Sequence, residues 1–190
     1  PEVPRRIDIL CAGAEAAGCA FAMPDDASIA PIAAIHSAEY LTFLRNIHAR
    51  WSRMDGAGAE VIPNIHPANR TDGYPRSAVG QAGYHQADTA CPISAQTWDA
   101  AYWSAQTAIS AADTVAGGQR AVYALSRPPG HHAFADLAGG FCFLNNSAIA
   151  AQRLLDAGLR PAILDVDVHH GNGTQGIVYA RGEVVTVSIH

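Results

Sequence analysis

The 190-residue sequence has little charge and no cluster of basic side chains. Only 15% of its residues are charged, its formal net charge is −5, and 49% of its residues are hydrophobic. A nucleic-acid-binding surface needs clustered Lys and Arg, so nucleic acid is not an expected partner. The low charge and high hydrophobic fraction argue against disorder. The length suits one domain with a sizeable core.

Membrane and export signals are also missing from the sequence. It has no run of about 18 apolar residues, so neither a membrane span nor a membrane partner is expected. The N-terminus has no Met and no signal-peptide core, and resembles a cut end. The four cysteines lack zinc-knuckle spacing. We expect reduced, buried thiols in a cytoplasmic protein, with a disulfide as the alternative; the cysteines are Cys11, Cys19, Cys91 and Cys142.

Apolar side chains recur at helical spacing in several segments. This periodicity predicts helices over residues 5–18, 38–54, 97–116, 145–157 and 174–179. Ser37 is the expected N-cap of the second helix, and Asn145 or Asn146 that of the fourth. Trp51 and Trp98 fall on the apolar faces of their helices and are expected in the core. Residues 56–92 are rich in Gly, Pro, Asn and Asp and predict a long loop region.

Three short apolar runs predict strands over residues 121–125, 161–166 and 184–189. They alternate with predicted helices, which is typical of a parallel sheet with crossover helices. The expected fold class is therefore α/β, with a three-layer arrangement of a parallel sheet flanked by helices.

Two polar motifs directly follow the first two predicted strands, at residues 127–132 (RPPGHH) and 165–173 (DVDVHHGNG). Ligands of open parallel sheets collect beyond the carboxyl ends of the strands, so the motifs should lie together. In an extended segment alternate side chains share a face. Asp165, Asp167 and His169 would thus point to one side if the strand extends to His169.

A carboxylate and an imidazole form half of a zinc or iron(II) site, which suits Asp167 and His169. The sequence shows no third ligand with comparable spacing. His131 and His132 are better suited to moving protons near neutral pH. The expected groups that orient these two rings are Asp165 and Asn172. Close backbone approach and an aromatic wall are expected from Gly140 and Phe141.

Structural roles must be weighed against these functional ones. A tandem His pair is often incidental, and an Asp at a strand end often caps a helix. Both motifs at successive strand ends are harder to explain in this way. Arg127 suits either lining the site or binding carbonyls. Four histidines that precede both motifs are expected on the surface or in loops: His36, His48, His66 and His85.

The motifs at residues 127–132, 139–146, 165–173 and 186–190, with the segments 35–44 and 91–94, resemble the zinc-dependent histone deacetylase superfamily. Asn172 and the doubled proline at 128–129 favour its bacterial acetylpolyamine amidohydrolase branch. The resemblance implies an arginase-like α/β fold, a homodimer, and a zinc-dependent amidohydrolase that removes acetyl groups from small amines.

The resemblance also implies residue roles. It makes Asp167 and His169 the zinc ligands and His132 the general base and acid, acting on water activated by the metal. His131 becomes an electrostatic partner that pairs with Asp165. A structural potassium ion would be held by two side chains and three backbone carbonyls: Asp165 and Ser188, with the backbone of Asp167, His169 and Ile189. Gly140 and Phe141 would line the substrate channel.

The family extends past residue 190, where it supplies a second Asp ligand and a Tyr. We therefore expect residues 1–190 to be the N-terminal portion of a single, incomplete deacetylase-like domain. Three alternatives remain: a catalytically silent fragment or scaffold, a protein acetyl-lysine deacetylase, and a ureohydrolase of the arginase type. The last is disfavoured because its two-metal site needs more carboxylates than lie near His169.

Overall fold

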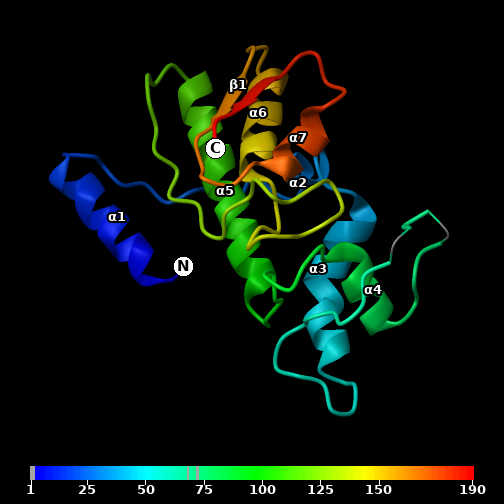
Figure 1. The fold of residues 1–190 in the computed structure, drawn as a ribbon. Coiled ribbons are helices and arrows are strands. Elements are labelled where there is room, and N and C mark those ends of the chain that lie inside the picture. The colour runs from blue at the N-terminus through cyan, green and yellow to red at the C-terminus, as the bar shows by residue number, and fades with distance from the viewer. Residues whose placement is uncertain (1–2, 68, 72) are drawn as a thin grey trace.

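The computed structural model describes residues 3–67, 69–71 and 73–190. Helices dominate the chain, and two strands lie near its C-terminal end (Figure 1). The elements in chain order are α1 (Arg5–Ala16), α2 (Ala30–Ala33), α3 (Ala38–Trp51), α4 (Ala78–His85), α5 (Thr97–Ala116), α6 (Asn146–Asp156), β1 (Ala162–Asp165), α7 (Asn172–Val178) and β2 (Val185–Ser188).

The helices predicted from periodicity are present. Ser37 caps α3 by accepting a hydrogen bond from the Tyr40 N–H at 3.2 Å, as predicted. Of the two candidate caps for α6, Asn145 is the one used, and it accepts from the Ala148 N–H at 3.0 Å. Each cap satisfies a backbone donor that the first helical turn leaves unpaired.

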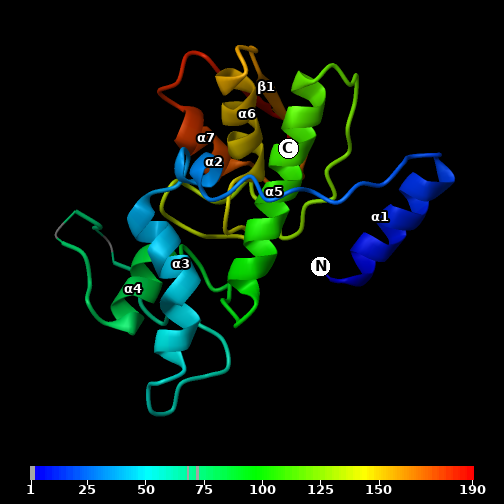
Figure 2. The same ribbon diagram turned by 180° about the vertical axis from the view of Figure 1, so that it is seen from behind.

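The main core lies where α3, α4, α5 and α6 meet. Helices α5 and α6 lie side by side in both views, with α3 and α4 packed together below them (Figures 1 and 2). Tyr40 is fully buried, and its hydroxyl donates to the Phe143 carbonyl at 2.7 Å. Trp51 and Trp98 are partly buried and pack against this core. The Phe143 contact ties the loop before α6, which follows the first polar motif, to the helical core.

Strands β1 and β2 pair in parallel, with Asp165 opposite Ser188. Helix α7 lies between them in the sequence, so this region is a parallel crossover unit and confirms the α/β prediction. One side of the pair packs Ile163 against residues of α6 and α7. The other side leaves Leu164 and Val187, which are opposite each other, 64% and 48% exposed. The described residues form no helical layer over that second face.

Two predictions about secondary structure were wrong. No strand forms over residues 121–125, because a strand needs a neighbour to share backbone hydrogen bonds and none of the described strands pairs with this segment. The region 56–92 is not entirely loop, since it contains α4. The amphipathic helix expected at the N-terminus does form as α1, but none of its residues is buried and it lies apart from the other helices in Figure 1.

Burial also corrects expectations for individual side chains. His36, predicted at the surface or in a loop, lies in the loop between α2 and α3 but is only 2% exposed. His85, for which the same was predicted, is instead the last residue of α4 and is 0% exposed. The Nδ1 atoms of the two rings bond the backbone carbonyls of Ala135 and Asp136, respectively. His48 is half-buried and His66 exposed. All four cysteines are free thiols, but Cys19 is exposed and Cys11 half-buried because they lie on or beside α1, while Cys91 and Cys142 are buried. In the described part of the chain, no helix combines the length and apolarity that crossing a membrane requires.

Candidate active site

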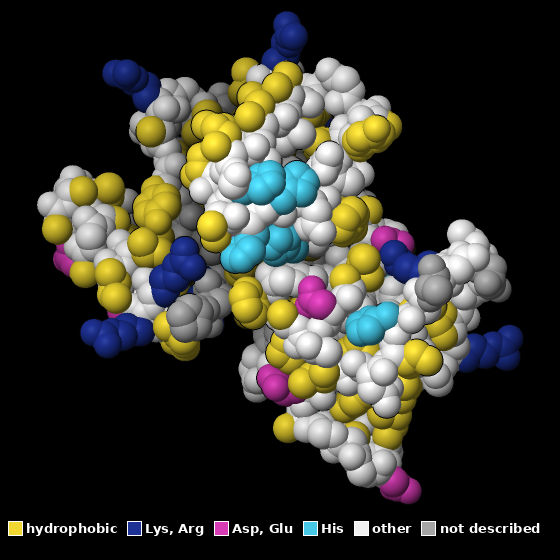
Figure 3. Space-filling view, in the orientation of Figure 1, with side chains coloured by type: hydrophobic (Ala, Val, Ile, Leu, Met, Phe, Trp, Pro, Cys, Tyr) yellow, Lys and Arg dark blue, Asp and Glu magenta, His cyan; other side chains and the backbone are white. Residues whose placement is uncertain are grey.

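A cavity of about 670 Å³ opens where the two polar motifs meet. Imidazole side chains gather at the centre of this face of the molecule (Figure 3). Seven residues singled out from the sequence line the cavity: Arg127, His131, His132, Gly140, Phe141, Asp167 and His169. The fold therefore brings together groups that are up to 42 positions apart in the sequence.

His131 is paired with the carboxylate at the end of β1. Its Nδ1 lies 2.9 Å from Oδ2 of Asp165, and both side chains are largely buried, at 16% and 13% exposed. A carboxylate oxygen only accepts, so His131 carries a proton on Nδ1. Next to this pair, a Cβ added to Gly171 would lie 2.2 Å from Asp165 Oδ2 and 3.3 Å from His131 Nδ1. The glycine backbone thus closes directly over the pair.

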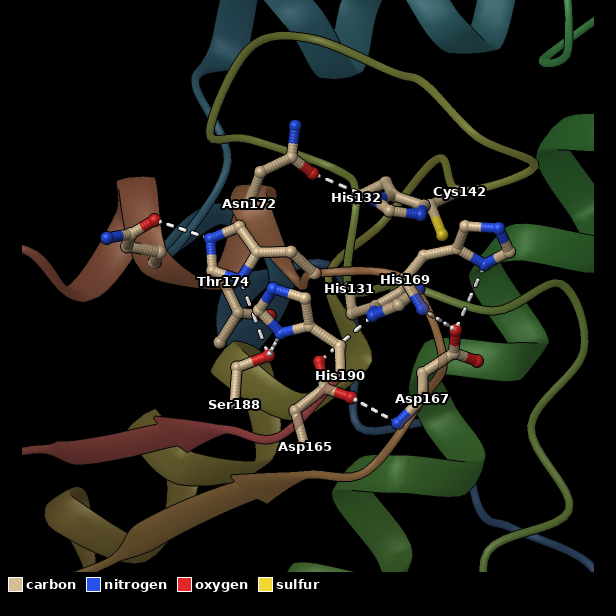
Figure 4. A network of polar contacts seen from close by, with 12 residues as sticks. His131, His132, Cys142, Asp165, Asp167, His169, Asn172, Thr174, Ser188 and His190 are labelled. Carbon is tan, nitrogen blue, oxygen red and sulfur yellow. Dashed lines mark hydrogen bonds and ion pairs between the residues drawn. The ribbon is translucent and has the colours of Figure 1, made fainter.

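His132 is held in a similar way by an amide from α7. Its Nδ1 lies 2.7 Å from Oδ1 of Asn172, the first residue of that helix. The ring centroids of His131 and His132 are 4.1 Å apart, and that of His169 is 6.2 Å from His132 (Figure 4). Both tandem imidazoles therefore have Nδ1 engaged, which leaves each Nε2 as the available basic nitrogen.

Asp167 and His169 lie together just beyond β1. The strand ends at Asp165 rather than extending to His169, because side-chain oxygens take over the backbone donors that follow. Asp165 Oδ1 accepts from the Asp167 N–H at 3.1 Å, and Asp167 Oδ1 accepts from the His169 N–H at 2.9 Å. The resulting turns still place His169 Nδ1 3.3 Å from Asp167 Oδ1.

The hydrogen bond from the His169 N–H, aided by nearby imidazoles, holds the pKa of Asp167 below its ordinary value. The Asp167 carboxylate is thus ionised at neutral pH and available to a cation, and its side chain is 48% exposed. Across residues 3–67, 69–71 and 73–190, no three His, Cys, Asp or Glu side chains converge in a metal-binding arrangement. Asp167 and His169 form a two-donor set.

Ser188 and Asp165 lie opposite each other in the sheet register, and the Asp165 carbonyl accepts from the Ile189 N–H at 2.9 Å. Ser188 Oγ contacts two imidazoles, at 3.4 Å from His170 Nδ1 and 3.3 Å from His190 Nδ1. The two residues predicted to hold potassium through their side chains are thus neighbours in the sheet, and the Ser188 hydroxyl is engaged by histidines (Figure 4).

Several residues at this site were not predicted from the sequence. Helix α1 contributes Ile7 and Leu10 to the cavity wall, and the unpaired segment after α5 contributes Leu125. Asp88 binds the Gly140 backbone from the segment after α4. No sequence signal identifies these residues, because their positions depend on tertiary packing between distant segments.

Comparison with known proteins supports one family. The family model described as the histone deacetylase domain matches residues 1–190. An acetylpolyamine amidohydrolase from Burkholderia pseudomallei (strain 1710b) is 52% identical over 190 residues, which is all of this chain and 55% of that protein. Acetylpolyamine amidohydrolase 1 from Pseudomonas aeruginosa PAO1 is 45% identical over 194 residues, which is all of this chain and 56% of that protein. The chain spans about half the length of these curated relatives.

Solved structures agree with the sequence comparison. The crystal structure of the acetylpolyamine aminohydrolase from Burkholderia pseudomallei matches with a TM-score of 0.95 and 52% identity, covering all of this chain and 55% of that one. The HD domain of HDA15 matches with a TM-score of 0.73 and 25% identity, covering all of this chain and 47% of that one. The chain belongs to the histone deacetylase family.

Proposed function

We propose that residues 1–190 belong to an amidohydrolase that removes acetyl groups from small amines, acetylpolyamines in particular. This proposal rests on the cavity in which two oriented imidazoles, His131 and His132, face the donor pair Asp167 and His169. The relatives from Burkholderia and Pseudomonas are named acetylpolyamine amidohydrolases, which supports this substrate class over acetyl-lysine in proteins.

The donor set fits half of a zinc site. Asp167 offers an anionic oxygen and His169 a ring nitrogen 3.3 Å away, and both face the cavity. One carboxylate and one imidazole suit Zn²⁺, with Fe²⁺ as the alternative. A cation bound there would act as a Lewis acid toward water and the acetyl carbonyl.

His132 is the proposed general base and acid. The Asn172 amide oxygen fixes the proton of the ring on Nδ1, so Nε2 can take a proton from the attacking water and deliver it to the leaving amine. His131 has the same tautomer because it donates to Asp165. Its ring centroid lies 4.1 Å from that of His132, so the Asp165 carboxylate holds the proposed electrostatic partner beside the proposed base.

Further properties of the complete protein belong to the same proposal. The side chains of Asp165 and Ser188, with the backbone carbonyls of Asp167, His169 and Ile189, would hold a structural K⁺, which prefers oxygen ligands. Gly140 and Phe141, which line the cavity, would form the substrate channel. We place the protein in the cytoplasm as a homodimer; its four free cysteines suit a reducing compartment.

An assay of acetate release tests this function. We expect N-acetylputrescine to be hydrolysed faster than an acetyl-lysine peptide in the presence of Zn²⁺, both by the 190-residue chain and, more rapidly, by any longer product of its gene. His132→Ala should lower kcat by about 100-fold or more, since general acid–base catalysis contributes that much. His66→Ala, at an exposed histidine outside the cavity, is the matched control. No turnover of any acetylated amine would contradict the proposal.

Metal analysis separates this enzyme from a silent scaffold. We expect zinc to bind the purified chain and to be lost in Asp167→Ala but not in Asp55→Ala, which removes an exposed carboxylate elsewhere. Equal zinc content in the two variants, or none in the unaltered chain, would favour the scaffold.

A further inference from the structure

Two consecutive residues in the cavity wall have left-handed backbone conformations. Gly140 has φ +50° and Phe141 has φ +69°. A glycine adopts this region freely, but an aromatic residue rarely does, so the surrounding structure must hold Phe141 there. The side chain of Phe141 is 50% exposed, and thus its own burial does not supply that hold. Two backbone hydrogen bonds close this turn, from the Gly139 N–H to the Cys142 carbonyl at 3.1 Å and from the Cys142 N–H to the Gly139 carbonyl at 2.8 Å.

Asp88, in the segment that follows α4, adds a contact from outside the turn. Its Oδ2 accepts a hydrogen bond from the Gly140 N–H at 2.9 Å. Its Oδ1 accepts from the Ala90 N–H at 2.8 Å, and the Ala90 carbonyl in turn accepts from the Phe141 N–H at 3.2 Å. One carboxylate therefore fixes both strained residues, the first directly and the second through Ala90.

The segment that Asp88 holds is in contact with His132. A Cβ added to Gly140 would lie 2.3 Å from Cδ2 of His132 and 3.2 Å from its Nε2. The Gly140 backbone therefore packs against the edge of the ring that carries the basic nitrogen, while Asn172 holds Nδ1 on the other side. A displacement of Gly140 would give the imidazole room to turn.

We propose that Asp88 is a positioning residue, which holds the Gly140–Phe141 turn in place and through it fixes the His132 imidazole and the channel wall. Its catalytic consequence rests on the proposed function. Its structural basis does not, since the hydrogen bonds that Asp88 accepts from the Gly140 and Ala90 N–H groups exist whatever the reaction.

Amide exchange measured by NMR on the 190-residue chain tests the hold directly. In Asp88→Ala, exchange at Gly140 and Phe141 should accelerate on the order of ten-fold or more, since each amide depends on the lost carboxylate. Asp88→Asn keeps one acceptor oxygen, so it should lose only one of the two hydrogen bonds and accelerate exchange less than Asp88→Ala does. Asp55→Ala, at an exposed carboxylate in the turn after α3, is the matched control. Unchanged exchange at Gly140, or equal acceleration throughout α5 and α6, would overturn the proposal.

A second readout separates positioning from mere structural support. The His132 ring resonances should shift and broaden in Asp88→Ala, and in acetate release kcat should fall while KM rises, with partial recovery in Asp88→Asn. Altered exchange with unchanged ring resonances and kinetic constants would overturn the positioning role. If even the unaltered protein hydrolyses no acetylated amine, the proposed function fails, and exchange and ring resonances still decide the inference.

Discussion

Gly171 is the residue that allows the His131–Asp165 pair to form beneath the backbone. A Cβ at this position would lie 2.2 Å from Asp165 Oδ2, so Gly171→Ala should displace the carboxylate and lower the free energy of unfolding by about 1–3 kcal/mol. Gly182→Ala is the matched control, because its Cβ would meet no heavy atom within 4 Å. Urea denaturation measures both. Equal stability of the two variants would show that the pair tolerates displacement.

His36 should make stability depend on pH. Its Nε2 accepts from the Asn145 N–H at 2.9 Å and its Nδ1 lies 3.2 Å from the Ala135 carbonyl, so the buried ring is neutral. Burial lowers the pKa of His36 from 6.5 to about 4. Between these values only the unfolded chain binds the proton, so stability falls as pH decreases. Between pH 7 and pH 4.5, protonation of His36 in the unfolded chain should lower the free energy of unfolding by about 2–3 kcal/mol.

The measurement for His36 is a comparison of urea denaturation at the two pH values. His36→Gln replaces the ring with a neutral group that both donates and accepts, so the variant should lose less stability on acidification than the unaltered chain. The same loss in both proteins would mean that other groups carry the pH dependence.

At the scale of elements, the cap of α6 also connects the site to the core. Asn145 accepts from the Ala148 N–H, and its amide donates to the Ala133 carbonyl at 2.9 Å and to Thr174 Oγ1 at 3.1 Å. Asn145→Ala removes the cap and leaves buried partners unsatisfied, which should cost about 2–4 kcal/mol. Ser77→Ala removes the exposed cap of α4 and should cost about 1 kcal/mol. Thermal or urea denaturation measures both costs. Equal costs would show that the buried partners of Asn145 add nothing beyond the cap.

The sequence predicted the helices well because caps and periodicity are local. Helix α4 was missed because two glycines in eight residues lower its helix propensity. The prediction of a strand at 121–125 was wrong because strand formation depends on pairing with a distant segment. The meeting of the two polar motifs was predicted from strand ends in a parallel sheet, although only the second motif follows a described strand, and the pairing of His131 with Asp165 was implied by the family resemblance. Asp88 could not be identified, since its contact with Gly140 spans 52 positions and depends on the packing of the whole segment after α4.

At the scale of the whole molecule, apolar surface concentrates on one face of the β1–β2 pair. Leu164, Val185 and Val187 alternate with half-buried residues and are between 48% and 64% exposed. Just beyond the strands, Val166 and Ile189 are 72% and 63% exposed. A two-stranded sheet with an open apolar face and unpaired edges is marginal in water and presents backbone groups to other chains.

The 190-residue chain should therefore associate with itself through this face as its concentration rises. A charge introduced there would have to be desolvated on association, so Val187→Lys should shift sedimentation velocity profiles toward monomer. Ile9→Lys is the matched control, because Ile9 is 61% exposed but lies on α1, away from the sheet. If Ile9→Lys reduced association as much as Val187→Lys, the effect would come from net charge. If neither variant changed an observed association, the contact would lie elsewhere on the molecule.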